Sequence, residues 1–251
     1  MPEGGPPCEY LDWDSKFFSL RIGRVAGSQR LDPQSMLEIL TWCRSQSIDV
    51  LYFLADPCDP ATPRLAEQYG FNLVDVRVVL GAVAATAAAH GDDDRIRLFK
   101  PEDVPALASI ARSSHRDSRF YFDGRFPEKL CDALYETWIV KSCNGYADAV
   151  FVADEAGRAA GYISCHLDPN GEGRIGLVAV GAAAQGKGIG RSLVERALEW
   201  FSGSGVRSVS VVTQGRNCHA QRLYQRCGFT TRSLGLWYHL WLNPPPEGSA
   251  R

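Results

Sequence analysis

The sequence lacks the features that mark several large classes of protein. It has no stretch of about 20 uninterrupted apolar residues, which a transmembrane helix requires. Its first residues, MPEGG, carry neither the basic region nor the apolar run of a secretory signal, so we expect a cytoplasmic protein. Lys and Arg number 27 against 29 Asp and Glu, and this net charge of −2 gives no basic surplus for nucleic acid.

Metal-site patterns are also missing. The chain has 8 cysteines, but it has no C-x-x-C pair and no Cys/His cluster at zinc spacing. We therefore predict no metal site, and we expect reduced thiols that are mostly buried.

What the chain does have is enough length for one large domain or two modest ones, with 251 residues of which 45% are hydrophobic. Its clearest shift in composition is GAVAATAAAHGDDD at residues 81–94, which suits a connector between packed units, the alternative being an alanine-rich helix. We predict an N-terminal domain at 1–82, a linker at 83–92, a second domain at 93–243 and a disordered tail at 244–251.

Hydrophobic periodicity and turn residues predict the elements of both domains. The first domain reads as β-α-β-α-β, with strands at 17–25, 48–54 and 71–80 and helices at 33–45 and 62–69. In the second we expect a strand at 95–99, a helix at 101–111, an irregular stretch at 113–127 and a helix at 128–142. Strands at 149–154, 159–166 and 174–180 follow, then a helix at 187–201, a strand at 208–213, a helix at 218–227 and a strand at 236–242. The short turns between the three consecutive strands require antiparallel neighbours, so the predicted class is α/β with a mixed, mostly antiparallel sheet.

The most informative segment is GLVAVGAAAQGKGIGRS at residues 176–192, where a strand runs into glycines that open an amphipathic helix. Backbone N–H groups at a helix N-terminus lack intrahelical partners, and glycines let a ligand approach them closely, so this turn suits a pyrophosphate. The spacing G-x-G-x-G excludes the Rossmann pattern, and Gly188 after Lys187 excludes a P-loop.

This segment resembles the acetyl-CoA signature Q-x-x-G-x-G of the GNAT acetyltransferases, and the resemblance covers about residues 93–242. Asn217 followed by Tyr224-x-x-x-Gly228-Phe229 agrees with it. It implies the GNAT fold and acetyl-CoA as co-substrate. It also implies that an amine attacks the thioester directly, with the carbonyl polarised by a strand N–H near Val178.

Site residues follow from the same resemblance. It implies that the pantetheine arm pairs with strand backbone and that the helix N-terminus holds the pyrophosphate. The cofactor-binding set is Leu177, Val178, Ala179, Val180, Gln185, Gly186, Lys187, Gly188, Ile189, Gly190, Arg191 and Asn217. Tyr224 is the expected general acid for the leaving thiolate, the alternative being a packed tyrosine. Asn217 contacts the pantetheine or caps a helix.

The sequence does not decide which residue, if any, acts as the general base. His166 reads as an ordinary strand-end histidine and His219 as a surface residue, while His115 lies in the irregular segment on the acceptor side. A water chain without a dedicated base is the remaining alternative.

Other segments resemble one subgroup, the TDP-4-amino-4,6-dideoxyhexose N-acetyltransferases such as the TDP-fucosamine enzymes. They are LDWDSKFF at 11–18, DSRFYF at 117–122 and YETW at 135–138. This likeness implies a TDP-amino sugar as acceptor, with Arg119, Tyr121 and Gln214 as candidate contacts. The alternatives are another small amine or a protein N-terminus as acceptor, or a module that binds acyl-CoA without catalysis. By analogy with the family, we also expect a homodimer.

Overall fold

The computed structural model describes residues 7–26, 30–84 and 93–244, which belong to two compact units. Unit 1 comprises Met1–Arg77, Ser118–Leu130 and Leu234–Arg251, and unit 2 comprises Val78–Asp117 and Cys131–Ser233. The units interleave along the chain, whereas the predicted domains, 1–82 and 93–243, are consecutive. That consecutive division stays a prediction. Residues 85–92 of the predicted linker and the predicted tail from residue 245 lie outside the described residues.

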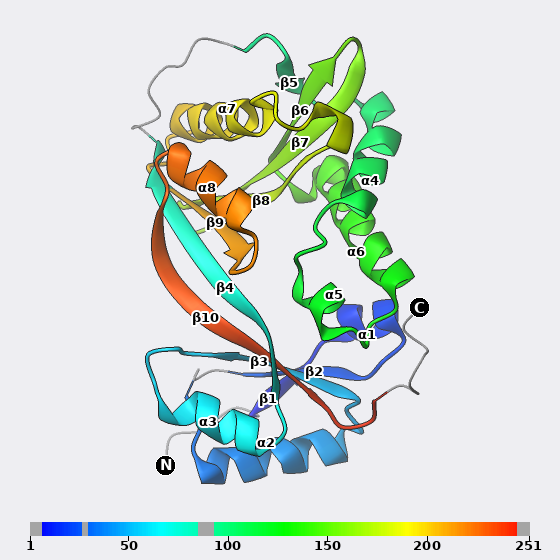
Figure 1. Ribbon diagram of the computed structural model, residues 1–251, viewed down its shortest axis with the longest axis vertical. Helices are drawn as coiled ribbons and strands as arrows, with labels where there is room; N and C mark the ends of the chain where they lie inside the picture. The colour runs from blue at the N-terminus through cyan, green and yellow to red at the C-terminus, as the bar shows by residue number, and fades with distance from the viewer. Residues whose placement is uncertain (1–6, 27–29, 85–92, 245–251) are drawn as a thin grey trace. The chain divides into compact units, whose positions relative to one another are not determined.

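Unit 1 contains strands in the order β1-β2-β3-β10 (Figure 1). They are β1 (Cys8–Tyr10), β2 (Ile22–Val25), β3 (Val50–Ala55) and the unit 1 part of β10 (Thr230–Trp241). β2 and β3 are parallel, and the other two pairs are antiparallel. The helices of this unit are α1 (Asp12–Phe18), α2 (Pro33–Ser45), α3 (Ala61–Gln68) and α5 (Arg119–Asp123).

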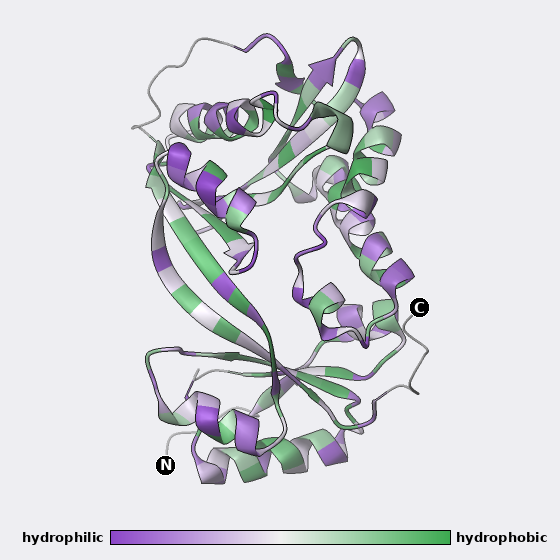
Figure 2. Cartoon of the chain, in the orientation of Figure 1, coloured by the Kyte–Doolittle hydropathy of each residue, from purple (hydrophilic) through white to green (hydrophobic). Residues whose placement is uncertain are grey.

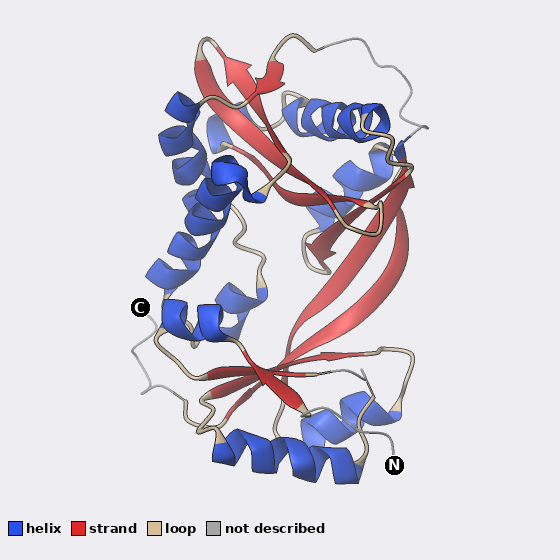
Figure 3. Ribbon diagram, turned by 180° about the vertical axis from the view of Figure 1, so that it is seen from behind, coloured by secondary structure: helices blue, strands red, loops and turns tan. Residues whose placement is uncertain are grey.

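Alternation along β3 builds two apolar layers in unit 1, because successive side chains of a strand point to opposite faces. Leu51 and Phe53 join the core cluster that contains Met36 and Ile39 of α2. The intervening Tyr52 stacks on His239, with ring centroids 4.6 Å apart. Figure 3 shows helices on both sides of these strands, so both faces of β3 are covered.

Unit 2 contains strands in the order β4-β9-β8-β7-β6-β5. They are the unit 2 part of β4 (Asn72–Val83), β5 (Ile96–Leu98), β6 (Ala149–Glu155), β7 (Arg158–Leu167), β8 (Gly173–Val180) and β9 (Ser208–Gln214). Its α-helices are α4 (Val104–Ser113), α6 (Glu128–Lys141), α7 (Ile189–Gly203) and α8 (Cys218–Arg226). Short helical turns lie at Pro101–Asp103, Ser142–Tyr146 and Ala182–Ala184. β5 to β8 are antiparallel and β8–β9 is parallel, so the predicted class, a mixed sheet flanked by helices, is confirmed.

Two local predictions were wrong. Phe17 and Phe18, placed in a strand at 17–25, belong to α1. Two acidic residues in the first turn of α1 and an ion pair of 2.7 Å between Lys16 and Asp12 favour the helix over the aromatic β-propensity. The stretch predicted to be irregular contains α5, a five-residue helix that ends at Gly124 in the left-handed conformation.

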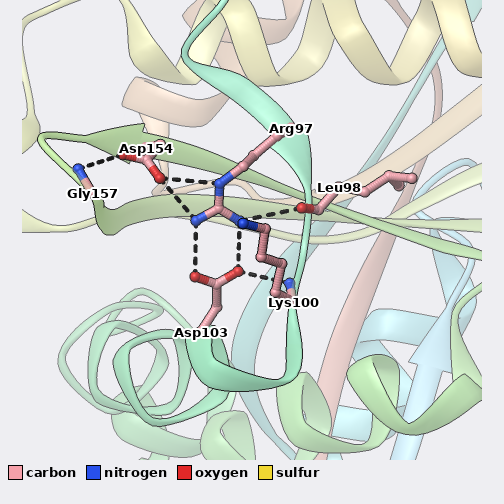
Figure 4. A network of polar contacts seen from close by, with 6 residues as sticks. All are labelled: Arg97, Leu98, Lys100, Asp103, Asp154 and Gly157. Atoms are coloured by element: carbon pink, nitrogen blue, oxygen red, sulfur yellow. Dashed lines mark hydrogen bonds and ion pairs between the residues drawn. The ribbon is translucent and has the colours of Figure 1, made fainter.

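A polar network holds β5 against the hairpin of β6 and β7 (Figure 4). The Arg97 guanidinium donates to Asp103 at 2.7 and 3.0 Å and to Asp154 at 2.9 and 3.0 Å. These contacts hold the pKa of Asp103 below its usual range, and Asp154 also accepts from the Gly157 amide at 2.7 Å. The network therefore fixes the turn that follows Glu155.

Within the part of the chain that the structure describes, no helix is long and apolar enough to cross a membrane. The same residues contain no group of three or more His, Cys, Asp or Glu that could hold a metal ion. All eight cysteines are described and are free thiols, four of them buried and two exposed.

Candidate active site

The two parallel strands of unit 2 pair over only part of their length. Their described ladder runs from Gly173–Val209 to Ile175–Val211, whereas β8 continues to Val180 and β9 to Gln214. On its other side, the end of β8 pairs with β7, where Val178 is opposite Ile163 and Ala179 is opposite Tyr162. The β9-facing edge of β8 beyond Ile175 therefore resembles a sheet edge to which an extended ligand can add as a strand.

A bulge marks the start of this segment. The β7–β8 register shifts between Ile163 and Cys165, and the Leu177 amide donates to the Ser164 hydroxyl at 2.9 Å instead of to a carbonyl. Glycine is favoured at position 176, because a Cβ there would lie 2.6 Å from His166 Nε2 and 2.7 Å from Ser164 Oγ and would displace these side chains. Bulges bend and twist a strand, which is consistent with the end of the β8–β9 ladder at this level.

The glycine loop after β8 opens α7. Gly186 and Gly188 have φ of +79° and +80°, a left-handed conformation that glycine adopts without strain. The amides of Arg191 and Ser192 both donate to the Gly188 carbonyl, at 2.9 and 3.2 Å. The amides of Ile189 and Gly190 precede these bonds, so they are first-turn donors without an intrahelical acceptor, at the positive end of the helix dipole.

The side chains of the loop show how it is held. Gln185 Nε2 donates to the Val180 carbonyl at 3.0 Å, which ties the loop to the end of β8. Lys187 Nζ lies 3.0 and 3.1 Å from the two carboxylate oxygens of Glu155, and Arg191 Nε donates to Glu195 at 2.7 Å. Sequence reasoning missed both carboxylates. The i,i+4 spacing signals Glu195, but no pattern signals Glu155, which is far away in the sequence.

Tyr224 lies on α8, which Figure 2 shows as mostly hydrophilic along its length. Its side chain is nevertheless buried, and that burial raises the pKa of the phenol, so it stays protonated at neutral pH. Asn217 Oδ1 accepts from the Ala220 amide at 3.0 Å, so Asn217 caps α8. The predicted contact of Asn217 to the co-substrate stays a prediction.

The three candidate bases have different surroundings, all within unit 2. His115 Nε2 lies 3.1 Å from the Tyr162 hydroxyl. His166 is buried, and burial lowers its pKa. His219 is exposed on α8.

The candidate sugar-binding residues are divided between the units. Arg119 and Tyr121 lie in α5 of unit 1, and Gln214 ends β9 of unit 2. The Arg119 guanidinium lies 4.1 Å from the ring centroid of Trp237 and 4.7 Å from those of Tyr52 and Phe120. It is therefore held by cation–π contacts.

Unit 1 also holds a buried pair that no sequence pattern predicted. His239 Nδ1 lies 2.5 Å from Asp123 Oδ2, and Asp123 also accepts from Trp241 Nε1 at 3.1 Å. The side chains of His239 and Asp123 are 0% and 2% exposed. Burial lowers the pKa of His239 to about 4 in spite of the carboxylate.

Comparison with known proteins identifies the family. Residues 105–229 match the model of the acetyltransferase (GNAT) family, a range that includes the end of β8, the glycine loop and Tyr224. The chain contains a GNAT acetyltransferase domain. GNAT enzymes transfer an acetyl group from acetyl-CoA to an acceptor.

Relatives of this GNAT protein include the dTDP-fucosamine acetyltransferase of Escherichia coli, 29% identical over 92% of this chain and 96% of that protein. The spore coat polysaccharide biosynthesis protein SpsD of Bacillus subtilis is 31% identical over 57% of this chain, which spans only 49% of that relative. The structure of a GCN5-related N-acetyltransferase from Sphaerobacter thermophilus superposes on 97% of this chain and 79% of its own. Its TM-score is 0.70 at 18% identity, which shows the shared fold.

Proposed function

We propose that this protein acetylates the amine of a nucleotide-linked amino sugar, a TDP-4-amino-4,6-dideoxyhexose. The observation that carries the proposal is the match to dTDP-fucosamine acetyltransferase, which extends over 92% of this chain and therefore beyond the GNAT domain. The predicted sugar contacts of Arg119, Tyr121 and Gln214 stay predictions, as do the cytoplasmic location and the homodimer.

In the proposed mechanism, the backbone of Leu177 to Val180 pairs with the pantetheine arm of acetyl-CoA. The amides from Gly186 to Gly190 bind the pyrophosphate, helped by Lys187 and Arg191. What supports this assignment is the edge of β8 beyond the β9 ladder and the uncapped start of α7.

The chemical step is direct transfer. The amine nitrogen attacks the thioester carbon, the C–N bond forms, and the C–S bond breaks to release a thiolate. The N–H of Val178 polarises the carbonyl, and Tyr224 gives the thiolate its proton. This role requires a protonated phenol, and the buried Tyr224 keeps its proton at neutral pH.

The test is thiol release from acetyl-CoA with TDP-4-amino-4,6-dideoxygalactose as acceptor. We expect turnover by the wild type and a fall of about 10²-fold or more in Tyr224→Phe, with CoA binding preserved. Tyr146→Phe is the matched control, because this tyrosine of unit 2 is 68% exposed and has no proposed role.

The outcomes separate the parts of the proposal. If Tyr224→Phe turns over the sugar as fast as the wild type does, the proposed acceptor is supported and the role of Tyr224 as general acid is refuted. Absence of turnover with this sugar, while CoA binds, would refute the acceptor and favour another amine.

A further inference from the structure

His115 is held in an unusual conformation directly after α4. Its φ is +57°, in the left-handed region that few residues other than glycine adopt. The imidazole stacks on Tyr135 of α6, with centroids 4.5 Å apart and planes 15° apart, and its Nε2 lies 3.1 Å from Tyr162 Oη on β7. Two elements therefore fix this ring, and local backbone strain of this kind concentrates at functional sites.

The contact to Tyr162 places His115 beside the segment assigned to pantetheine. Tyr162 is the register partner of Ala179 on β8, so the two side chains share a face of the sheet. The adjacent Ile163 is opposite Phe151, whose ring contacts Trp200 of α7, so Ile163 faces α7. Tyr162 and His115 therefore lie on the other face, on which α4 packs against β7 and β8.

The surroundings of His115 keep its imidazole neutral. Burial lowers its pKa to about 4, and the hydrogen bond of the ring within the described residues is to the Tyr162 hydroxyl and not to a carboxylate. Ionisable groups in the neighbouring segments include Tyr135 and Asp132 of α6, Tyr162 of β7, Cys143 beside Tyr162, and Arg116 and Asp117 of its own loop. Asp132 lies 3.2 Å from the guanidinium of Arg116, so this neighbouring charge is paired. When Nε2–H donates to Tyr162 Oη, the lone pair of Nδ1 is left to accept a proton.

We infer that His115 is the general base that takes a proton from the acceptor amine, and that Tyr162 is the positioning residue that sets its tautomer. The inference rests on the proposed function. The proton leaves the nitrogen as the C–N bond forms and goes to His115 Nδ1, while the thiolate receives one from Tyr224. Exchange with water then returns the imidazolium and the tyrosinate to their starting states, so the transfer is balanced.

His166 provides the matched comparison, since it also lies in unit 2 and burial lowers its pKa as well. Its ring contacts that of Tyr146, with centroids 5.3 Å apart, and its Nε2 lies against Gly176. We assign it no proton transfer.

The decisive variant is His115→Gly, because glycine accepts the positive φ and leaves a space that imidazole from solution can fill. We expect its kcat for thiol release with TDP-4-amino-4,6-dideoxygalactose to fall by about 10²- to 10⁴-fold, with KM for acetyl-CoA within about twofold of the wild type. Added imidazole should restore part of kcat. His115→Asn, which also tolerates a left-handed backbone, should lose kcat without rescue.

Two further variants sharpen the result. Tyr162→Phe, which keeps the ring and removes the hydroxyl, should lower kcat by about tenfold through the tautomer of His115 and should not respond to imidazole. His166→Gln should leave kcat within about threefold of the wild type, and imidazole should not change it.

Each outcome has a definite meaning. If His115→Gly folds, binds CoA and turns over at the wild-type rate, His115 is not the general base. The same conclusion follows if His115→Gly loses kcat and added imidazole does not restore any of it. If added imidazole restores kcat in His166→Gln and not in His115→Gly, the role of general base belongs to His166. If the wild type binds CoA but acetylates no TDP-amino sugar, the proposed function is refuted. If both the wild type and His115→Gly are active, the proposed function stands and only the assignment of the base fails.

Discussion

At Lys187 the ammonium group lies 3.0 and 3.1 Å from the two carboxylate oxygens of Glu155. An anionic ligand at the glycine loop therefore meets the negative charge of Glu155 as well as the positive charge of Lys187. Removing that carboxylate in Glu155→Gln should tighten CoA binding by about two- to fivefold, the effect of one partly exposed charge at this range. Titration calorimetry at low and high salt would measure it, and the gain should shrink as salt rises.

Glu136→Gln is the matched control for this change, because Glu136 of α6 pairs with Arg112 of α4 and not with a residue of the glycine loop. It removes the same charge from the molecule, so its CoA affinity should stay within about 1.5-fold of the wild type. Equal gains in both variants would contradict a local role for Glu155.

Among single residues, sequence reasoning could predict backbone conformations that depend on local chain geometry. The glycines of the loop were predictable, since a helix N-terminus and a tight turn are coded within a few residues. The partners Glu155 and Asp123 were not, because they meet Lys187 and His239 only through the fold.

At the scale of elements, α8 is capped by the residue that precedes it. Asn217 Oδ1 accepts from the Ala220 amide at 3.0 Å, and α8 carries the buried Tyr224. Asn217→Ala should lower the free energy of unfolding by about 1 kcal/mol, the usual cost of losing a helix N-cap, and urea denaturation would show it as a lower midpoint. Asn217→Asp keeps an acceptor oxygen at the cap and should retain most of that stability. A stable Asn217→Ala would show that packing alone holds α8.

The hairpins of unit 2 could be predicted from the sequence because each short turn fixes an antiparallel pair. The turn at 155–157 joins β6 to β7, and a glycine with positive φ stands in each of the two turns, Gly157 in the first and Gly171 in the second. The short helices could not be predicted in the same way. In α5, three aromatic residues out of five give no helical period, and the helix forms where Phe120 packs on Phe18 at 5.4 Å.

At the scale of the whole molecule, neither of the two units is one continuous segment of the chain. The chain passes between them at 77–78, 117–118, 130–131 and 233–234. A shift in composition marks only a boundary that the chain crosses once, so the alanine-rich stretch at 81–94 carries no information about α5 or β10. Strand β10 itself has residues in both units.

Stability of the folded chain should depend on pH through its buried histidines. The pKa of His239 is lowered to about 4 by burial, against about 6.5 in an unfolded chain. Between these two values the unfolded state binds more protons than the folded state, so the free energy of unfolding rises with pH across this window. The contribution of His239 is complete above about pH 6.5 and is lost as the pH falls toward 4, by up to about 3 kcal/mol.

Urea denaturation at pH 7, 6 and 5 would measure this slope, and His115, whose pKa is also lowered to about 4, adds to it in unit 2. His239→Gln should start from a lower stability, because Asp123 loses a buried partner, but its loss between pH 7 and 5 should be smaller. His219→Gln, at an exposed histidine of α8, should keep the wild-type slope. A His239→Gln variant that loses as much stability between pH 7 and 5 as the wild type does would mean that His239 holds its proton in the folded state, as an ion pair with Asp123.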